Sequence, residues 1–130
     1  MSLTVNYLSG TKFKITCRKH SIITDQPESE EGTDQGMTPV ELLVASLSAC
    51  TAYYTSLFLN RRIQDLTNLE VRGTWNYLEG PHRVGIINLT VVPPRVLTKQ
   101  EKIGLLRSIE NCTIENTLKN TPEIRVDIED

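Results

Sequence analysis

The N-terminal part of the chain alternates apolar and polar side chains with the period of a β-strand. Phe13, Ile15 and Cys17 alternate with lysine, threonine and arginine residues, which predicts a half-buried strand whose inner face carries Cys17. Residues 21–24 are expected to return antiparallel to this strand, and residues 3–8 form a further candidate strand. The pattern therefore predicts a small antiparallel sheet in this part of the chain.

Two longer strands and a final short one are predicted in the second half of the chain. Residues 69–78 and 84–92 have the pattern of a strand pair, joined by the turn-rich sequence EGPHR. Two prolines at residues 93–94 end the second strand, because proline cannot donate to a ladder. Ile124, Val126 and Ile128 alternate with charged residues, which predicts a last strand.

A long helix is predicted between these two groups of strands. Residues 42–59 carry no charge, and an apolar stretch of about 18 residues is the lower limit for a membrane span. The serine, threonine and tyrosine residues within it favour a helix buried inside a protein instead. Thr38 and Glu41 have the spacing of a capping box ahead of the helix, with Pro39 at its first position.

A second capping box, formed by Thr98 and Glu101, opens a shorter helix that is expected to run to about Glu110. Strands that come in pairs, with few helices between them, favour an α+β fold with antiparallel sheets over a doubly wound parallel fold. The length of 130 residues suits one domain, residues 1–130. Residues 25–37 contain several acids and no base, and we interpret them as a solvated loop or, alternatively, as a lid near a site.

Composition narrows the classes of function. The chain has 14 lysine and arginine residues against 16 aspartate and glutamate residues, whereas nucleic-acid binders usually show a clustered basic excess. The N-terminus has no basic region followed by an apolar run, so we expect a cytoplasmic protein that binds neither nucleic acid nor membrane. Hydrophobic residues make up 38% of the chain and aromatic residues 5%, a thin supply for a self-contained core. We therefore expect a second subunit to complete the core.

Three cysteines and two histidines limit the candidate chemistry. No pair of them has the spacing of metal ligands, so we expect neither a metal nor a cofactor. Cys50 lies in the middle of the long helix, where a buried thiol is usually just a small hydrophobic residue. Cys112 would cap a new helix over residues 113–119, where a lowered thiol pKa is expected, unless the preceding helix continues through it. Cys17 is interpreted as a packing residue.

Two sequence motifs resemble those of the OsmC/Ohr family, which comprises osmotically induced protein C and the organic hydroperoxide resistance proteins. The first motif is GMTPVELLVASLSAC, which resembles the family's first-cysteine helix and ends at Cys50. The second motif is ENCTIENTLK, which resembles the family's second-cysteine region and contains Cys112. The motifs occur in the right order, and the resemblance extends over essentially the whole chain, with the divergent OsmC-like branch as its nearest match.

The resemblance implies an α+β homodimer with intertwined subunits, in which antiparallel sheets wrap around long central helices and two active sites lie at the interface. In the peroxidase branch the first cysteine attacks the peroxide O–O bond and becomes a sulfenic acid. The second cysteine condenses with it to a disulfide, which a dithiol, a lipoyl group in the best-known members, then reduces. Carried over by position, Cys50 is the peroxidatic cysteine and Cys112 is the resolving cysteine.

The chain departs from the peroxidase pattern near both motifs. Peroxidase members have a glutamate ten residues before the first cysteine, which holds a catalytic arginine, and here that position is Val40. Glu41 follows one residue later, a turn of about 100° on a helix, and is also explained by the capping box. Arg18 is the only arginine before the helix and is the candidate for the catalytic arginine. Thr113 replaces the proline that is common after the second cysteine.

These observations leave three hypotheses for function. The leading one is a thiol-dependent peroxidase that reduces organic hydroperoxides, with catalytic residues Cys50, Cys112, Arg18 and Glu41. The second is a non-peroxidatic module on the same scaffold, which binds a small acyl or thiol-bearing ligand between subunits and is favoured by the missing glutamate. The third is a structural or interaction protein without thiol chemistry, in which both cysteines only pack.

Overall fold

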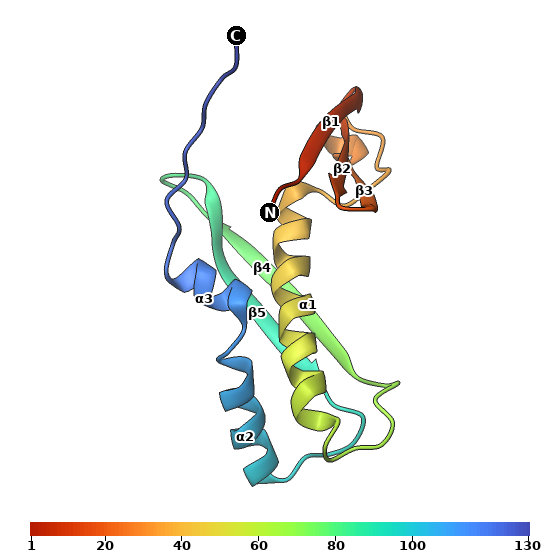
Figure 1. The fold of residues 1–130 in the computed structure, drawn as a ribbon, viewed down its shortest axis with the longest axis vertical. Helices are drawn as coiled ribbons and strands as arrows, with labels where there is room; N and C mark the ends of the chain where they lie inside the picture. The colour runs from red at the N-terminus through yellow and green to blue at the C-terminus, as the bar shows by residue number, and fades with distance from the viewer. The chain divides into compact units, whose positions relative to one another are not determined.

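Three α-helices, five strands and one short 3-10 turn make up the structure, a computed structural model that describes residues 1–130 (Figure 1). In chain order the elements are β1 (Thr4–Ser9), β2 (Lys12–Cys17), β3 (His20–Thr24), η1 (Glu28–Glu30), α1 (Pro39–Leu59), β4 (Glu70–Leu78), β5 (Arg83–Val92), α2 (Lys99–Ile109) and α3 (Thr113–Lys119). The strands form two antiparallel sheets, one of β1-β2-β3 and one of β4-β5. The α+β class and the antiparallel pairing predicted from the sequence are confirmed.

The chain divides into two compact units, Met1–Val44 and Ala45–Asp130, and helix α1 begins in the first and continues in the second. The first unit holds the three-stranded sheet, in which β2 is central. Cys17 is the last residue of β2 and is exposed, with Sγ 3.6 Å from the carbonyl oxygen of Ser2. The prediction that Cys17 packs inward is therefore wrong for the single chain, since the end of the strand leaves its side chain uncovered.

A single buried carboxylate organises the loop that follows β3. Asp25 accepts hydrogen bonds from the hydroxyls of Thr11 at 2.6 Å and Thr33 at 2.5 Å, and from the backbone N–H groups of Gln26 and Gln35. These bonds, with Thr11 first, hold the pKa of Asp25 well below its usual range. The Asp25 side chain therefore holds the acidic segment 25–37 in place through hydrogen bonds to residues near both of its ends.

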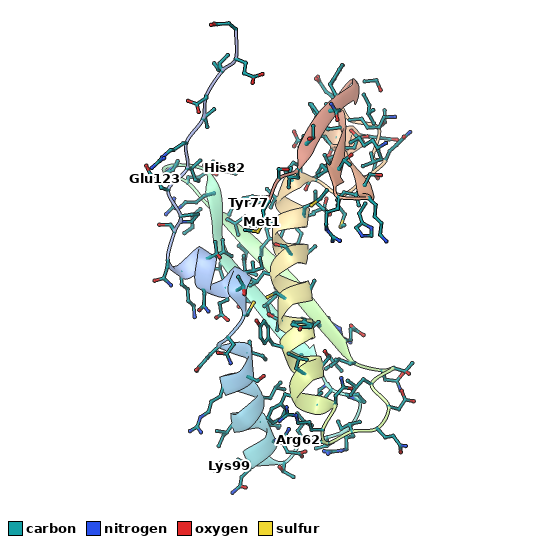
Figure 2. The ribbon with its side chains drawn as sticks, viewed as in Figure 1. Met1, Arg62, Tyr77, His82, Lys99 and Glu123 are labelled. Carbon is teal, nitrogen blue, oxygen red and sulfur yellow. The ribbon has the colours of Figure 1, made fainter.

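Helix α1 begins with the predicted capping box. The N–H of Glu41 donates to the hydroxyl of Thr38 at 3.1 Å, and the N–H of Thr38 donates to the Glu41 carboxylate at 2.9 Å. The helix ends at Leu59, shortly before Arg61 and Arg62. The guanidinium of Arg62 donates to the carbonyl of Phe58 at 2.7 Å and lies over the Phe58 ring (Figure 2). This is the end of a helix that favours a cation.

Within the second unit α1 buries one face and exposes the other. Its buried face repeats at helical spacing and consists of Leu47, Thr51, Thr55 and Leu59, whereas Tyr53 and Leu57 on other sides are exposed. The single chain therefore buries only one face of the predicted buried helix, and the burial of its other faces by a second subunit stays a prediction. The physical reason is that one hairpin and two short helices are too small to surround it.

The remaining apolar surface of α1 bears on the question of a membrane. By length and composition alone this helix could cross a membrane. Its most apolar stretch has a mean hydropathy of 1.5, and 28% of that stretch is buried. The core helix of a soluble protein passes the same test, so the observation is weak evidence for a membrane span.

The core of the second unit lies between α1 and α2. Leu59, Leu97 and Leu105 are its buried centre. The two helices approach closely, because a Cβ atom added at Gly104 would lie 2.9 Å from the Phe58 ring. Figure 1 shows the β4–β5 hairpin passing α1, with α2 and α3 beside it. This arrangement leaves room between α1, β5 and the two short helices, where the candidate site lies.

The strand predicted near the C-terminus is not formed. No helix or strand follows α3, and Ile124, Val126 and Ile128 are 82%, 85% and 94% exposed. A strand exists only where its backbone pairs with a neighbour, and the single chain provides no such neighbour for this segment. The prediction is therefore wrong for the isolated chain, although the alternation of apolar residues that motivated it is present.

Candidate functional site

The structure brings together the two cysteines that the sequence motifs single out. Cys50 lies in the middle of α1 and Cys112 lies directly before α3, and the two thiols are close enough for Cys50 to raise the pKa of Cys112. Both are free thiols. Cys112 is completely buried, whereas Cys50 is half-buried. The pair therefore combines one thiol that a small molecule can approach with one that it cannot.

Cys112 occupies the N-cap position of α3, as one of the two sequence interpretations predicted. Its sulfur accepts a hydrogen bond from the backbone N–H of Glu115 at 3.5 Å. Burial nevertheless raises the pKa of the Cys112 thiol, and the hydrogen bond with Cys50 raises it further, while the Glu115 N–H acts in the opposite direction. The lowered pKa expected for Cys112 is therefore wrong, because the loss of water outweighs the donors of one short helix.

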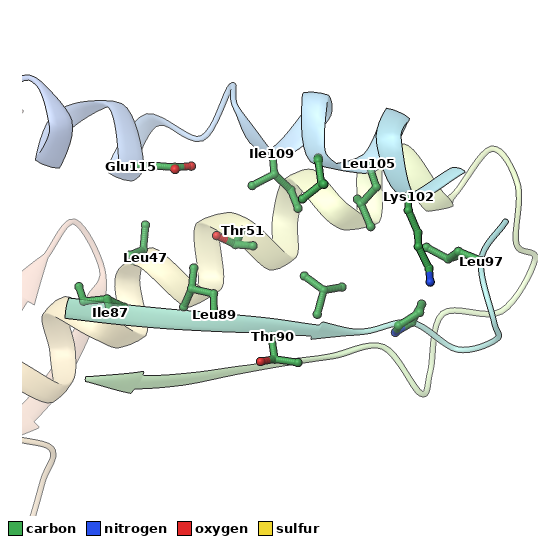
Figure 3. A pocket seen from close by; sticks show the side chains of 13 residues that line it. Leu47, Thr51, Ile87, Leu89, Thr90, Leu97, Lys102, Leu105, Ile109 and Glu115 are labelled. Carbon is green, nitrogen blue, oxygen red and sulfur yellow. The ribbon is translucent and has the colours of Figure 1, made fainter. Parts of the chain in front are cut away.

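A cavity of about 580 Å³ lies beside the cysteine pair, between α1, β5, α2 and α3 (Figure 3). Leu47 and Thr51, which line it, flank Cys50 along α1, and Glu115, which also lines it, donates its N–H to Cys112. Most of the wall is aliphatic, with side chains that include Ile87, Leu89, Val91, Leu97, Leu105 and Ile109. The size is typical of sites for small organic ligands.

Thr51 and Lys102, two polar residues that line the cavity, were not predicted as site residues from the sequence. Thr51 is 2% exposed, and its hydroxyl has no hydrogen-bond partner. Lys102 brings the cavity's one ammonium group from α2. Neither carries a signal in the sequence, because threonine is common in a weakly polar helix and lysine is common on a surface helix. No group of three histidine, cysteine or acidic residues is placed to hold a metal ion.

The other two predicted site residues, Arg18 and Glu41, lie in the first unit. Arg18 lies in a turn, and Glu41 lies in the capping box of α1. Arg18 is in the turn between β2 and β3, with a φ of 54° in the left-handed region. The Glu41 carboxylate is engaged by the N–H of Thr38 in the capping box. The contribution of Arg18 and Glu41 to a reaction stays a prediction.

Comparison with known proteins agrees with the fold and the motifs. A family model described as OsmC-like protein matches residues 32–127, while no curated protein matches the chain. A solved structure from Psychrobacter arcticus 273-4, proposed to be an osmotic stress induced and detoxification response protein, is similar with a TM-score of 0.80 and 18% identity, over 90% of this chain and 87% of that one. An OsmC like protein from Mycoplasma pneumoniae is similar with a TM-score of 0.69 and 20% identity, over 92% and 87% of the two chains.

A third similar structure is that of a protein named for resistance to organic hydroperoxides. It is that of an organic hydroperoxide resistance protein OsmC from Legionella pneumophila, with a TM-score of 0.66 and 16% identity, over 92% of this chain and 90% of that one. At these identities the similar structures establish the fold. The family model covers most of the chain and includes both Cys50 and Cys112. The chain therefore belongs to the OsmC-like protein family.

Proposed function

We propose that the protein is a thiol-dependent peroxidase that reduces organic hydroperoxides, with Cys50 as the attacking thiol and Cys112 as the resolving thiol. The observation that carries the proposal is the pairing of a half-buried Cys50 with a completely buried Cys112, next to Thr51 and Glu115, which line an apolar cavity. The similarity to the organic hydroperoxide resistance protein OsmC from Legionella pneumophila supports a redox role in the response to stress.

The reaction balances with the two thiols and one external reductant. The thiolate of Cys50 attacks one oxygen of the hydroperoxide ROOH, the O–O bond breaks, and the alkoxide takes up a proton and leaves as ROH. Cys50 is now a sulfenic acid. The sulfur of Cys112 attacks the Cys50 sulfur, and the displaced hydroxide takes the Cys112 proton and leaves as water. A dithiol then supplies two electrons and two protons by thiol–disulfide exchange, which restores both thiols.

The environment of Cys112 suits the resolving step better than the attacking step. Its raised pKa keeps it a protonated thiol near neutral pH, so it is a poor nucleophile towards peroxide but still carries the proton needed to release water. Its complete burial protects it from peroxide in solution. Its contact with Cys50 allows it to trap the sulfenic acid before further oxidation.

The proposal extends to the assembly and the surroundings of the protein. We place it in the cytoplasm, as a homodimer that acts on a small hydroperoxide and is reduced by a dithiol, without nucleic-acid or membrane partners. Exposed Tyr53 and Leu57 on α1 support a partner subunit, because large exposed apolar side chains on one element are typical of interfaces. Arg18 and Glu41 are included as candidate catalytic residues.

A peroxide-consumption assay tests the proposal directly. The purified protein is mixed with cumene hydroperoxide and dihydrolipoamide, and we expect turnover that is lost in Cys50→Ser and retained in Cys17→Ser. Intact-mass measurement after one equivalent of peroxide should show the loss of two hydrogens and a Cys50–Cys112 disulfide. Turnover no faster than that of the Cys50→Ser control would reject the peroxidase.

A second function is favoured by one specific departure from the family pattern. Val40 stands where the peroxidase members have a glutamate, and the apolar cavity is large enough to hold an organic ligand without any reaction. The alternative is therefore a module that binds a small acyl or thiol-bearing ligand. Native mass spectrometry of freshly purified protein separates the two, because a bound ligand or mixed disulfide supports binding, whereas the intramolecular disulfide supports the peroxidase.

A further inference from the structure

We propose that Thr51 is a further catalytic residue of the peroxidase, whose hydroxyl donates a hydrogen bond to the oxygen that leaves when the peroxide bond breaks. The inference rests on the proposed function and adds to it a residue that the sequence did not predict. It gives a role to a buried hydroxyl on α1 that the fold leaves without a hydrogen-bond partner.

The hydroxyl of Thr51 is available as a donor. A threonine inside a helix often donates to the carbonyl oxygen four residues earlier, but the Thr51 hydroxyl makes no hydrogen bond although the residue is only 2% exposed. A buried hydroxyl without a partner is unfavourable unless a ligand or water supplies the missing hydrogen bond. The fold therefore holds an unused donor in the wall of the cavity.

Among the side chains that line the cavity, Thr51 is the donor placed on the side of the cysteine pair. Besides Thr51, only Thr90 and Lys102 carry an N–H or O–H in their side chains. Figure 3 shows Lys102 at the opposite end of the cavity from Glu115, and Thr90 on the face of β5 that points away from α1. The backbone N–H of Glu115 already donates to the sulfur of Cys112.

The place of Thr51 in the helix suits a substrate with two oxygens. Thr51 follows Cys50 directly in α1, so their Cα atoms are about 3.8 Å apart. The two side chains diverge by about 100° around the helix axis, and the sulfur and the hydroxyl therefore point to different atoms of one small molecule. In a bound peroxide, Cys50 attacks one oxygen while Thr51 binds the other.

The hydrogen bond acts on the charge that develops during the reaction. The Cys50 thiolate gives an electron pair to the terminal oxygen of ROOH, an S–O bond forms, and the electrons of the O–O bond pass to the second oxygen as the alkoxide. Thr51 keeps its own proton and stabilises this anion, more strongly than water would because the wall is aliphatic. The proton that Cys50 released on ionisation returns through water and completes ROH.

Two oxidants separate this role from a merely structural one. tert-Butyl hydroperoxide releases an alkoxide, a strongly basic anion that depends on a donor. Peracetic acid transfers its terminal oxygen in the same way but releases acetate, whose charge is shared by two oxygens and needs no such donor. Loss of the Thr51 hydroxyl should therefore slow the first reaction and spare the second, whereas a displaced Cys50 would slow both.

The experiment measures the rate constant for oxidation of Cys50 in the full chain, by rapid quenching and intact mass after one equivalent of each oxidant. Thr51→Val and Thr51→Ala should lower the rate constant for tert-butyl hydroperoxide about a hundredfold, the usual effect of losing one such donor, and leave that for peracetic acid nearly unchanged. Thr51→Ser keeps the hydroxyl and should keep most of the rate. Thr55→Val, the matched control, removes another buried and unpartnered hydroxyl that lies outside the cavity, and both rate constants should stay unchanged.

The outcomes distinguish this inference from the proposed function. Equal slowing of both reactions by Thr51→Val, or no slowing of the reaction with tert-butyl hydroperoxide, would overturn the role of Thr51 and leave the peroxidase intact. A chain without substitutions that reacts with tert-butyl hydroperoxide no faster than Cys50→Ser would instead overturn the proposed function, and the role of Thr51 with it.

Discussion

At Cys112 two physical effects oppose each other. The N-cap position supplies a backbone N–H that favours a thiolate, while complete burial and the neighbouring Cys50 favour the protonated thiol. Burial dominates, because removing a charge from water costs more than one weak hydrogen bond returns. A residue that looks activated by its place in the sequence is therefore kept protonated by its surroundings.

The raised pKa of Cys112 has a consequence for stability. Its pKa in the folded protein lies above the ordinary value of 9.0, so in alkaline solution the unfolded chain loses this proton first. The free energy of unfolding should therefore be unaffected below about pH 9 and should fall as the pH rises through the folded pKa. Urea titrations between neutral and alkaline pH should show this fall in the Cys17→Ser control and a weaker one in Cys112→Ala.

The roles of the two thiols predict different intermediates. With Cys112→Ser the sulfenic acid on Cys50 has no thiol to condense with, so one equivalent of hydroperoxide should leave it available for labelling by dimedone. The unsubstituted protein and Cys17→Ser should label weakly, because the disulfide forms first. Strong labelling in all three proteins would contradict the assignment of Cys112 as the resolving thiol.

Gly36, which begins the first-cysteine motif, is required by a close backbone approach. A Cβ atom at this position would lie 2.1 Å from the carbonyl oxygen of Ile23, and the backbone must move to accept it. We expect Gly36→Ala to lower the free energy of unfolding by about 1–3 kcal/mol, the usual cost of overpacking. The exposed neighbour Met37 is the control, and Met37→Ala should have a much smaller effect in the same denaturant titration.

At the scale of the elements, both main helices begin at capping boxes that the sequence predicts. Thr98 and Glu101 form the box of α2 in the same way that Thr38 and Glu41 form the box of α1. Such boxes are readable from sequence because every contact lies within three residues. Arg95 also donates two hydrogen bonds to Glu101, and the spacing of the capping box does not predict this contact.

Glu101 makes the start of α2 sensitive to acid. The hydrogen bonds from Arg95 and Thr98 lower its pKa from 4.5 to about 2, so the unfolded chain binds this proton first as the pH falls. The contribution of Glu101 to stability should be complete above pH 4.5 and lost towards about pH 2. Acid titrations followed by circular dichroism should show a smaller pH dependence for Glu101→Gln than for the exposed control Glu129→Gln.

At the scale of the whole molecule, the single chain leaves apolar segments without partners. The C-terminal segment alternates exposed isoleucine and valine with charged residues, and this is the pattern of a strand with one face towards a core. The absence of a neighbouring strand within the chain supports the proposal that a second copy provides one. The apolar residues of one chain, which are few for a self-contained core, would then contribute to a core shared by two chains.

The proposed dimer predicts how substitutions in the C-terminal segment change the mass of the protein in solution. Light scattering should give twice the mass of the 14.7 kDa chain, and the double substitution Ile124→Asp with Ile128→Asp should shift the protein towards the monomer, because it places charges on the apolar side of the alternation. Asp127→Lys, on the polar side, is the control and should leave the mass unchanged. A monomer at micromolar concentration without any substitution would contradict the proposed assembly.

The sequence by itself determined the features that depend on neighbours a few residues apart. The capping boxes of α1 and α2, the alternation in β2 and β5, and the two cysteine motifs all belong to this class, and short-range geometry explains why they are readable. Only the tertiary structure decided the contact between Cys50 and Cys112, the direction of the Cys112 pKa and the unpartnered hydroxyl of Thr51. These depend on burial by residues distant in the chain, and burial sets the cost of a charge or an unmade hydrogen bond.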